Sequence, residues 1–223
     1  MRLPRRAVPG GLDDAAESAR IQTCLGVPPR LGAMALTREQ LVDAAVGVLS
    51  EFGLADLSMR RLARELDVQV GALYWHVKSK QELLVDVAAK LLDSVPRPNV
   101  PTPELAPMSI AALLRQLRSA LIAVPDSAEV MQLAQSMRPE SLDPMGWLLD
   151  FLSIAGVPEA DATYARHVLV NHLLGSIASH QEAVALSAGT EPGTVSTEWE
   201  EAAFDYGVRV ILQGLALEHP PVV

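Results

Sequence analysis

The 223-residue sequence contains one cysteine, Cys24, and only nine aromatic residues, and it has no long apolar run. A single cysteine cannot form a disulfide within the chain, which is typical of cytoplasmic proteins. No stretch approaches the roughly 20 apolar residues that span a membrane, and the arginines near the N-terminus are not followed by the apolar segment of a secretory signal. Because 49% of the residues are nevertheless apolar and mostly aliphatic, we expect an all-α protein with an aliphatic core.

The sequence also lacks the motifs of common enzyme and metal sites. It has no Gly-rich phosphate loop, no H-E-x-x-H or C-x-x-C pattern and no nucleophile elbow. His167 and His172 are five residues apart on one predicted helix, a spacing that does not stack two metal ligands. We therefore expect no metal, no cofactor and no catalysis; an enzyme that uses a C-terminal pocket is the less favoured alternative.

Positive charge is scarce overall, since the net charge is −9, but it is unevenly distributed. Residues 1–33 carry +2, residues 34–95 carry −2 and residues 96–223 carry −9. Residues 58–80, in contrast, carry +3. Because salt screens charges more than about 10 Å apart, a local basic patch can bind DNA even in an acidic protein.

Proline and glycine divide the chain into three parts. Residues 1–33 have several of both and no apolar periodicity, which predicts a flexible arm. Its arginines could reach a DNA minor groove, although a dispensable leader before a start at Met34 is the favoured interpretation. A linker with five prolines, Pro96 to Pro107, separates a predicted DNA-binding domain at 34–95 from a larger helical domain at 96–223.

The 34–95 segment shows the signals of four consecutive helices. Thr37 and Gln40 form a capping box before an apolar stripe that ends at Gly53, and Ser58 caps a second helix. The next turn places Asp67 where a left-handed backbone is expected, which aspartate tolerates better than most residues. A third, short helix spans about 69–75. The fourth runs from a second predicted capping box, Ser79 with Glu82, to residue 95.

The short third helix and the residues after it carry an unusual density of polar, aromatic and basic side chains, V-G-A-L-Y-W-H-V-K-S-K. A short helix of this kind held between apolar helices is typical of the second helix of a helix-turn-helix. Alternatively, its aromatics could fill the core while its lysines are merely solvated. We expect Leu73 and Val77 to pack inward in either case.

On these residues the segment Thr37 to Val95 resembles the DNA-binding domain of the tetracycline-repressor (TetR) family. L-S-M-R-R-L-A-R-E-L-D-V and G-A-L-Y-W-H-V-K-S-K-Q-E-L-L follow the family pattern without a gap. The resemblance implies an all-helical homodimer that binds palindromic operator DNA and releases it when a small organic effector binds. An activator, or a regulator that senses no ligand, is the alternative. The resemblance implies DNA contacts from Arg60, Gln69, Val70, Gly71, Tyr74, Trp75, His76 and Lys80.

The C-terminal part is predicted to form five further helices, near residues 109–124, 126–137, 143–156, 158–186 and 197–218. Asp143 is the predicted N-cap of the third, with Pro144 at its first position. The last two are apolar on more than one face, which indicates burial on more than one face. The family forms its dimer interface with these two helices, and small residues such as Gly207 would then allow close approach. An ordinary monomer core is the alternative.

A ligand pocket is expected among the helices of residues 109–186. Its candidate residues are Met131, Met137, Trp147, Phe151, His167 and Asn171, although core packing explains each apolar one equally well. By hand alignment, Met131 and Ser179 stand where tetracycline repressors hold a magnesium–drug chelate. Neither is a good magnesium ligand, so we expect a different, apolar or amphipathic effector.

Overall fold

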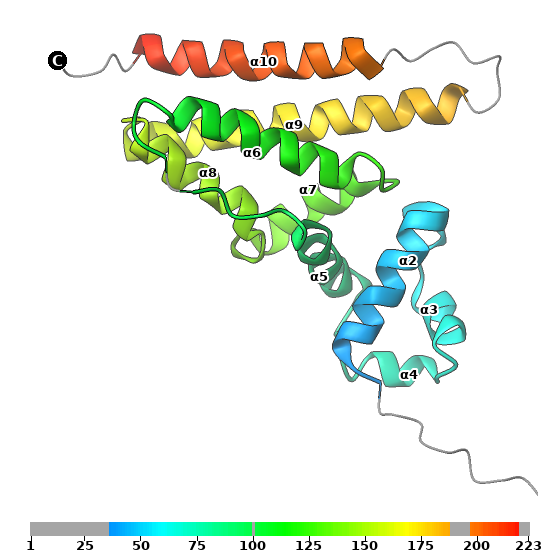
Figure 1. The fold of residues 1–223 in the computed structure, drawn as a ribbon. Helices are drawn as coiled ribbons and strands as arrows, with labels where there is room; N and C mark the ends of the chain where they lie inside the picture. The colour runs from blue at the N-terminus through cyan, green and yellow to red at the C-terminus, as the bar shows by residue number, and fades with distance from the viewer. Residues whose placement is uncertain (1–35, 100, 188–196, 219–223) are drawn as a thin grey trace, which may run out of the picture. The chain divides into compact units, whose positions relative to one another are not determined.

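The structure, a computed structural model, describes residues 36–99, 101–187 and 197–218, and every regular element in these ranges is helical. The predicted all-α class is confirmed (Figure 1). The predicted arm at 1–33, with its arginines and Cys24, lies outside the described residues. The division at residues 95 and 96 stays a prediction, because all described residues belong to one compact unit, Leu36–Val223.

The helices follow one another closely, and most bounds agree with the sequence patterns to within three residues. The N-terminal helices are α2 (Arg38–Asp56), α3 (Met59–Glu65), α4 (Val70–Leu73) and α5 (Lys80–Leu92). The C-terminal helices are α6 (Ala106–Leu121), α7 (Ser127–Met137), the 3-10 turn η1 (Pro139–Ser141), α8 (Asp143–Ile154), α9 (Glu159–Ser187) and α10 (Thr197–Glu218).

Both ends of α2 form as the sequence predicts. The Thr37 hydroxyl accepts a hydrogen bond from the Gln40 amide at 3.1 Å, and the Gln40 side chain accepts one from the Thr37 amide at 2.9 Å. Gly53 has φ +76° and ψ −179°, a conformation that only glycine adopts readily, and it interrupts the helix where the stop was expected. One irregular turn follows before Leu57.

The turn between α3 and α4 is a Schellman motif with aspartate in the position that glycine usually takes. Asp67 has φ +50°, and the Val68 amide donates to the Ala63 carbonyl at 2.9 Å. The Asp67 amide donates to the Arg64 carbonyl at 3.3 Å. The left-handed turn predicted at Asp67 is therefore confirmed, and it sets the direction in which α4 leaves α3.

Two capping predictions are wrong in part. The Ser79 hydroxyl caps α5 by accepting from the Glu82 amide, but the Glu82 carboxylate accepts from the Lys78 amide instead of completing a capping box. Asp143 is the first residue of α8, whose N-cap is Leu142, so the helix starts one residue early. Proline still fits in this first turn because its missing N–H has no partner there.

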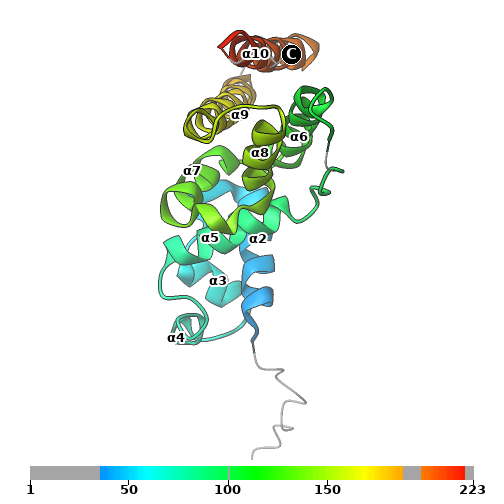
Figure 2. The ribbon, with the colours of Figure 1, turned by 90° about the vertical axis from the view of Figure 1, so that its left-hand side faces the viewer.

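The core is one contiguous aliphatic cluster that runs from α2 to α10. Its only aromatic members among the described residues are Phe151 and Phe204, which confirms the expected aliphatic core. Helix α5 packs against α2 on one side and α7 on the other (Figure 2). Helices α9 and α10 pack side by side, and α6 contacts both (Figure 1).

Candidate nucleic-acid interface and ligand sites

The recognition segment, residues 69–78, separates its side chains cleanly into buried and exposed sets. Leu73 and Val77 are buried, as predicted, and they fix α4 to the core. Tyr74 is half exposed, and Trp75 is 89% exposed. These two aromatics therefore do not fill the core, which removes the alternative interpretation of the segment. Exposed aromatics next to basic residues are available for bases and sugar-phosphate.

The remaining side chains of this segment leave an open outer surface at α4. Gln69 is the N-cap residue, is exposed, and makes no capping hydrogen bond through its side chain. Gly71 is exposed, and a Cβ atom at this position would meet nothing within 4 Å. Val70 is half-buried against the core, and His76 is half-buried with its carbonyl bonded to Arg38.

The nearby cations differ in how freely they can reach a phosphate. Arg60 and Arg64 project from α3 and are exposed, as is Lys78. Arg61 lies over the Phe52 ring at 3.7 Å and pairs with Asp56 at 3.0 Å. Lys80 is half-buried, and its Nζ donates to the Leu54 carbonyl at 3.3 Å. A phosphate contact by Lys80 stays a prediction, and the ammonium group has two further N–H donors for it.

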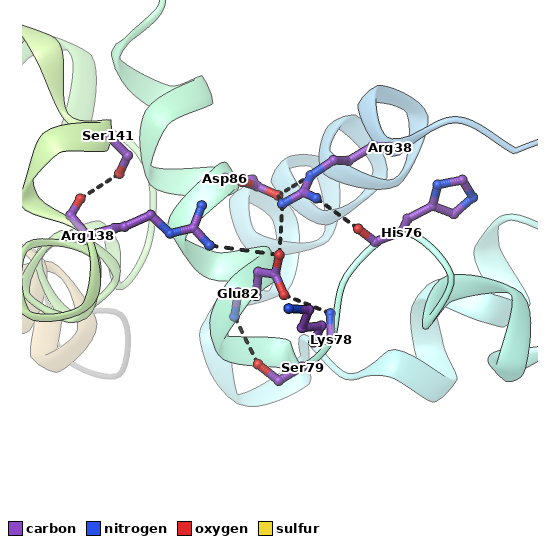
Figure 3. A network of polar contacts seen from close by, with 8 residues as sticks. All are labelled: Arg38, His76, Lys78, Ser79, Glu82, Asp86, Arg138 and Ser141. Carbon is purple, nitrogen blue, oxygen red and sulfur yellow. Dashed lines mark hydrogen bonds and ion pairs between the residues drawn. The ribbon is translucent and has the colours of Figure 1, made fainter.

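Glu82 on α5 is the centre of a polar network that joins three parts of the chain (Figure 3). Its Oε2 accepts from the Lys78 amide at 2.8 Å, and its Oε1 accepts from Arg38 Nη2 at 3.2 Å. Arg138, at the end of α7, lies 3.8 Å from the same Oε1. The hydrogen bond from the Lys78 amide, with the Arg38 contact, lowers the pKa of Glu82 despite its partial burial.

A second junction ties the end of α2 to the start of α7. The Asp126 carboxylate accepts from the Leu54 amide at 2.7 Å, and Asp126 itself has φ +58°. A Cβ atom on Gly53 would lie 2.8 Å from the Asp126 Oδ2, so glycine is required at this contact. Two separate polar contacts, Glu82 with Arg138 and Asp126 with Leu54, therefore connect the helix-turn-helix segment with α7.

The six candidate pocket residues lie in different surroundings. Met131 and Phe151 are buried in the core, Trp147 is half-buried with Arg97 at 5.8 Å from its ring, and Met137 is 46% exposed. His167 and Asn171 are exposed on α9 and hydrogen-bonded to each other at 3.0 Å, so they share one face of that helix. Asn171 lines the cavity described next.

A cavity of about 440 Å³ lies between α6, α9 and α10. It is lined by Arg118, Asn171, His172, Gly175, Ser176, Ser179, Trp199, Glu200, Ala203 and Phe204. Of these positions, only Asn171 is among the ligand-binding residues predicted from the sequence. Arg118 was missed, although it interrupts the apolar stripe formed by Leu114, Leu117 and Leu121, and that interruption is a signal visible in the sequence.

Helices α9 and α10 expose a set of large apolar side chains. They are Tyr164, Val168, Val184 and Leu186 on α9, and Trp199, Tyr206 and Val210 on α10. Gly207 is not an exposed spacer, because a Cβ atom there would overlap the His172 ring of the same chain. That ring bonds the Phe204 carbonyl at 2.9 Å and stacks on its phenyl group. The close approach expected of Gly207 thus occurs between α9 and α10.

In the part of the chain that the structure describes, no group of three or more His, Cys, Asp or Glu side chains is placed to hold a metal ion. Across the same described ranges, no helix combines the length and the apolarity that a bilayer crossing demands.

Two family models match the chain. "Bacterial regulatory proteins, tetR family" matches residues 41–87, and "Tetracyclin repressor-like, C-terminal domain" matches residues 108–192. The tetracycline repressor protein class C of Escherichia coli is 30% identical over 186 residues, covering 80% of this chain and 83% of that protein.

Solved structures agree with the family models. BioQ with its natural double-stranded DNA operator is 31% identical, with a TM-score of 0.67, over 81% of this chain and 98% of that one. The Streptomyces coelicolor TetR family protein ActR in complex with (S)-DNPA is 26% identical, with a TM-score of 0.70, over 82% of this chain and 98% of that one.

Proposed function

The chain belongs to the TetR family of bacterial transcriptional regulators, and we propose that it is a homodimeric, ligand-responsive repressor acting in the cytoplasm. In this proposal it binds a palindromic operator and releases it when a small organic molecule binds the C-terminal part. The observation that carries the proposal is the recognition segment, whose aromatics face outward beside exposed arginines while Leu73 and Val77 anchor it to the core. Family members are regulators and not enzymes.

For operator recognition, α4 enters the major groove with its outer face. Gln69, Gly71, Tyr74 and Trp75 are exposed there and are the proposed base and backbone contacts, with Val70 and His76 at the edge. Arg60 reaches the phosphates from α3. Two copies related by a two-fold axis then read half-sites about one helical turn apart. A relative of this chain has been solved with its double-stranded DNA operator, which supports this mode of binding.

For dimer formation, the proposed interface is the exposed apolar face of α9 and α10. Tyr164, Leu186 and Trp199 are each at least 70% exposed, and a monomer would leave all three in water. Large apolar side chains left in water along both helices support an association site there. Pairing these helices with their copies would bury it and place the two α4 helices on one DNA face.

For the effector, an organic molecule other than magnesium–tetracycline is proposed. Met131 is fully buried in the core and offers only a thioether, and Ser179 offers a single neutral hydroxyl, so these positions are a poor ligand set for magnesium. The complex of ActR with (S)-DNPA supports a small-molecule effector for this type of domain.

For the release of DNA, α5 transmits a ligand-induced movement of α7 to the recognition segment. Its Glu82 bonds the backbone of Lys78 beside the recognition segment and also lies against Arg138 from α7. A ligand that displaces α7 would withdraw Arg138 and allow α5 to tilt, which changes the separation of the two α4 helices. The ligand releases DNA only to the extent that it binds the DNA-free form more tightly than the DNA-bound form. Operator DNA must then weaken ligand binding by the same factor by which the ligand weakens DNA binding.

The test begins with selection of binding sites from random-sequence DNA, since the operator is not known. Selected sites should be palindromic, and sedimentation should give two chains per site. Arg60→Ala should weaken binding by about 1–3 kcal/mol. Arg97→Ala, which removes an equal charge from an exposed position outside the helix-turn-helix segment and outside α9 and α10, is the matched control and should bind like the wild type. Selection of no consensus, or equal losses in both variants, would overturn the proposal.

A further inference from the structure

Arg118 is a positive charge buried inside the C-terminal part. Only 7% of its surface is exposed, and a guanidinium group stays protonated throughout the physiological pH range. Its contacts are a 3.4 Å hydrogen bond from Nε to the Ser176 hydroxyl and the Phe204 ring, 5.4 Å from the guanidinium carbon. Within the described ranges no carboxylate pairs with it. Because a buried, unpaired charge is costly, an anion is expected next to this group.

The space next to Arg118 has the size and lining of a small-molecule site. The cavity measures about 440 Å³, and ligand pockets generally measure roughly 300–1,000 Å³. Asn171 and Ser179 supply neutral polar groups on its wall, while Phe204 and Trp199 supply aromatic surface. A few polar groups among aromatic walls are typical of pockets that bind organic molecules.

We propose that this cavity binds an organic anion with a flat apolar body. Its carboxylate or sulfonate head group pairs with Arg118, and its body lies along Phe204 and Trp199. Ser176 occupies Nε, so the two terminal nitrogens of the guanidinium are the donors for the head group, a geometry that suits two oxygen atoms. This site rests on the proposed function, because it would be the effector site of the repressor.

One other charged group lines the cavity and does not neutralise Arg118. Glu200 bonds Nδ1 of His180 and is therefore the partner of the histidine. A rival occupant is a side chain from a second copy of this chain. Asn171 and Ser179 are exposed on α9, so in the proposed dimer the partner helices could close or fill the open side of the cavity.

The probe is anilinonaphthalene sulfonate, which fluoresces in apolar sites, compared with the uncharged phenylnaphthylamine, which has the same aromatic body. Arg118→Met should weaken sulfonate binding about tenfold or more, and binding of the neutral analogue by less than about twofold. Arg115→Met is the matched control: it lies on the same helix but is exposed and paired with Asp205, and both probes should bind as in the wild type.

A second variant keeps the test independent of the stability of Arg118→Met. Ser179→Glu places a carboxylate on the cavity wall and should weaken only the sulfonate. Circular dichroism confirms that each variant is folded. If folded variants lose both probes equally, or neither, Arg118 is not an anion site. If the probes are unaffected but Arg118→Met changes the monomer–dimer equilibrium in sedimentation, the second copy fills the cavity and the proposal is wrong.

Operator binding separates this proposal from the proposed function. Arg118→Met should still bind the selected operator DNA, because Arg118 is not part of the DNA-contacting face. Failure of the probe experiment with intact operator binding would overturn the anion site alone. If the wild type selects no operator, the proposed repressor function is wrong. The probe experiment then still decides whether Arg118 forms an anion site.

Discussion

Replacing glycine by alanine at two positions of α2 should have opposite effects on stability. Gly47 lies in the regular part of the helix and is exposed, and a Cβ atom there would meet nothing within 4 Å. Gly53 is buried at the end of α2, with φ +76° and the Asp126 carboxylate beside it. The two substitutions are chemically identical and six residues apart, so only their surroundings can distinguish them.

The expected magnitudes follow from these surroundings. Gly47→Ala should stabilise the protein by about 0.5–1 kcal/mol, because alanine loses less backbone entropy in a helix. At Gly53, alanine would be held in a backbone conformation that costs roughly 1–3 kcal/mol. It would also displace the Asp126 carboxylate from the Leu54 amide, and a hydrogen bond to a charged group contributes about 1.5–3 kcal/mol. We expect a total destabilisation of about 2–5 kcal/mol after relaxation.

Gly156 is a comparison position that has a positive φ but no contact like that of Gly53 with Asp126. It has φ +86° at the end of α8, but a Cβ atom there would meet nothing within 4 Å. Gly156→Ala should therefore cost only the backbone term, about 1–2 kcal/mol. The excess of Gly53→Ala over Gly156→Ala contains the contact with Asp126 together with the more restricted backbone of Gly53, whose ψ is −179°.

The assay is urea unfolding followed by circular dichroism, with all variants at one protein concentration because dimer formation would make the midpoint concentration-dependent. Equal midpoints for Gly47→Ala and Gly53→Ala would refute the reasoning. A Gly53→Ala midpoint equal to that of Gly156→Ala would show that neither the contact with Asp126 nor the ψ of Gly53 adds to the cost of a positive φ.

Three further predictions concern DNA binding, helix packing and acid sensitivity. Lys80→Ala should weaken binding to all DNA sequences alike and reduce the salt slope by about one; an unchanged slope would exclude a phosphate contact. Gly207→Ala should collide with His172, disturb the packing of α10 on α9 and lower the melting temperature, whereas Gly214→Ala, with open space around it, should not. Glu82→Gln should melt below the wild type at neutral pH. Because the folded pKa of Glu82 is lowered, its stabilisation is complete above the unfolded pKa of about 4.3 and is lost as pH falls through the folded value, so the two melting temperatures should converge in acid.

Sequence reasoning succeeded where structure depends on near neighbours. The Thr37 and Gln40 capping box, the left-handed turn at Asp67 and the helix stop at Gly53 each involve residues within a few positions of one another. The aliphatic core follows from composition, and the predicted inward packing of Leu73 is confirmed. The family resemblance added to the all-α class a helix-turn-helix followed by a larger helical part, and the matching family model and structures confirm it.

It failed where the deciding partner is distant in the chain. Gly207 was assigned to a contact between two copies, but its neighbour is His172 on the adjacent helix. Glu82 was expected to bond its own cap, but Arg38 and Arg138 reach it from helices far away in the sequence. Arg118 was missed because its place in the apolar stripe of α6 is visible in the sequence, but its burial under α9 and α10 is not. No pattern among neighbouring residues predicts contacts between helices that are far apart in the sequence.

The three tryptophans give the chain optical reporters at separate places. Trp75 stands almost fully in water at the recognition segment, Trp147 lies half-buried on α8, and Trp199 borders the cavity beside Arg118. Acrylamide should quench Trp75 readily in the free protein and poorly once DNA covers it. An aromatic molecule in the cavity would instead take up excitation energy from Trp199. Variants that keep only Trp75 or only Trp199 could report DNA binding or ligand binding, respectively, by intrinsic fluorescence and without an attached dye.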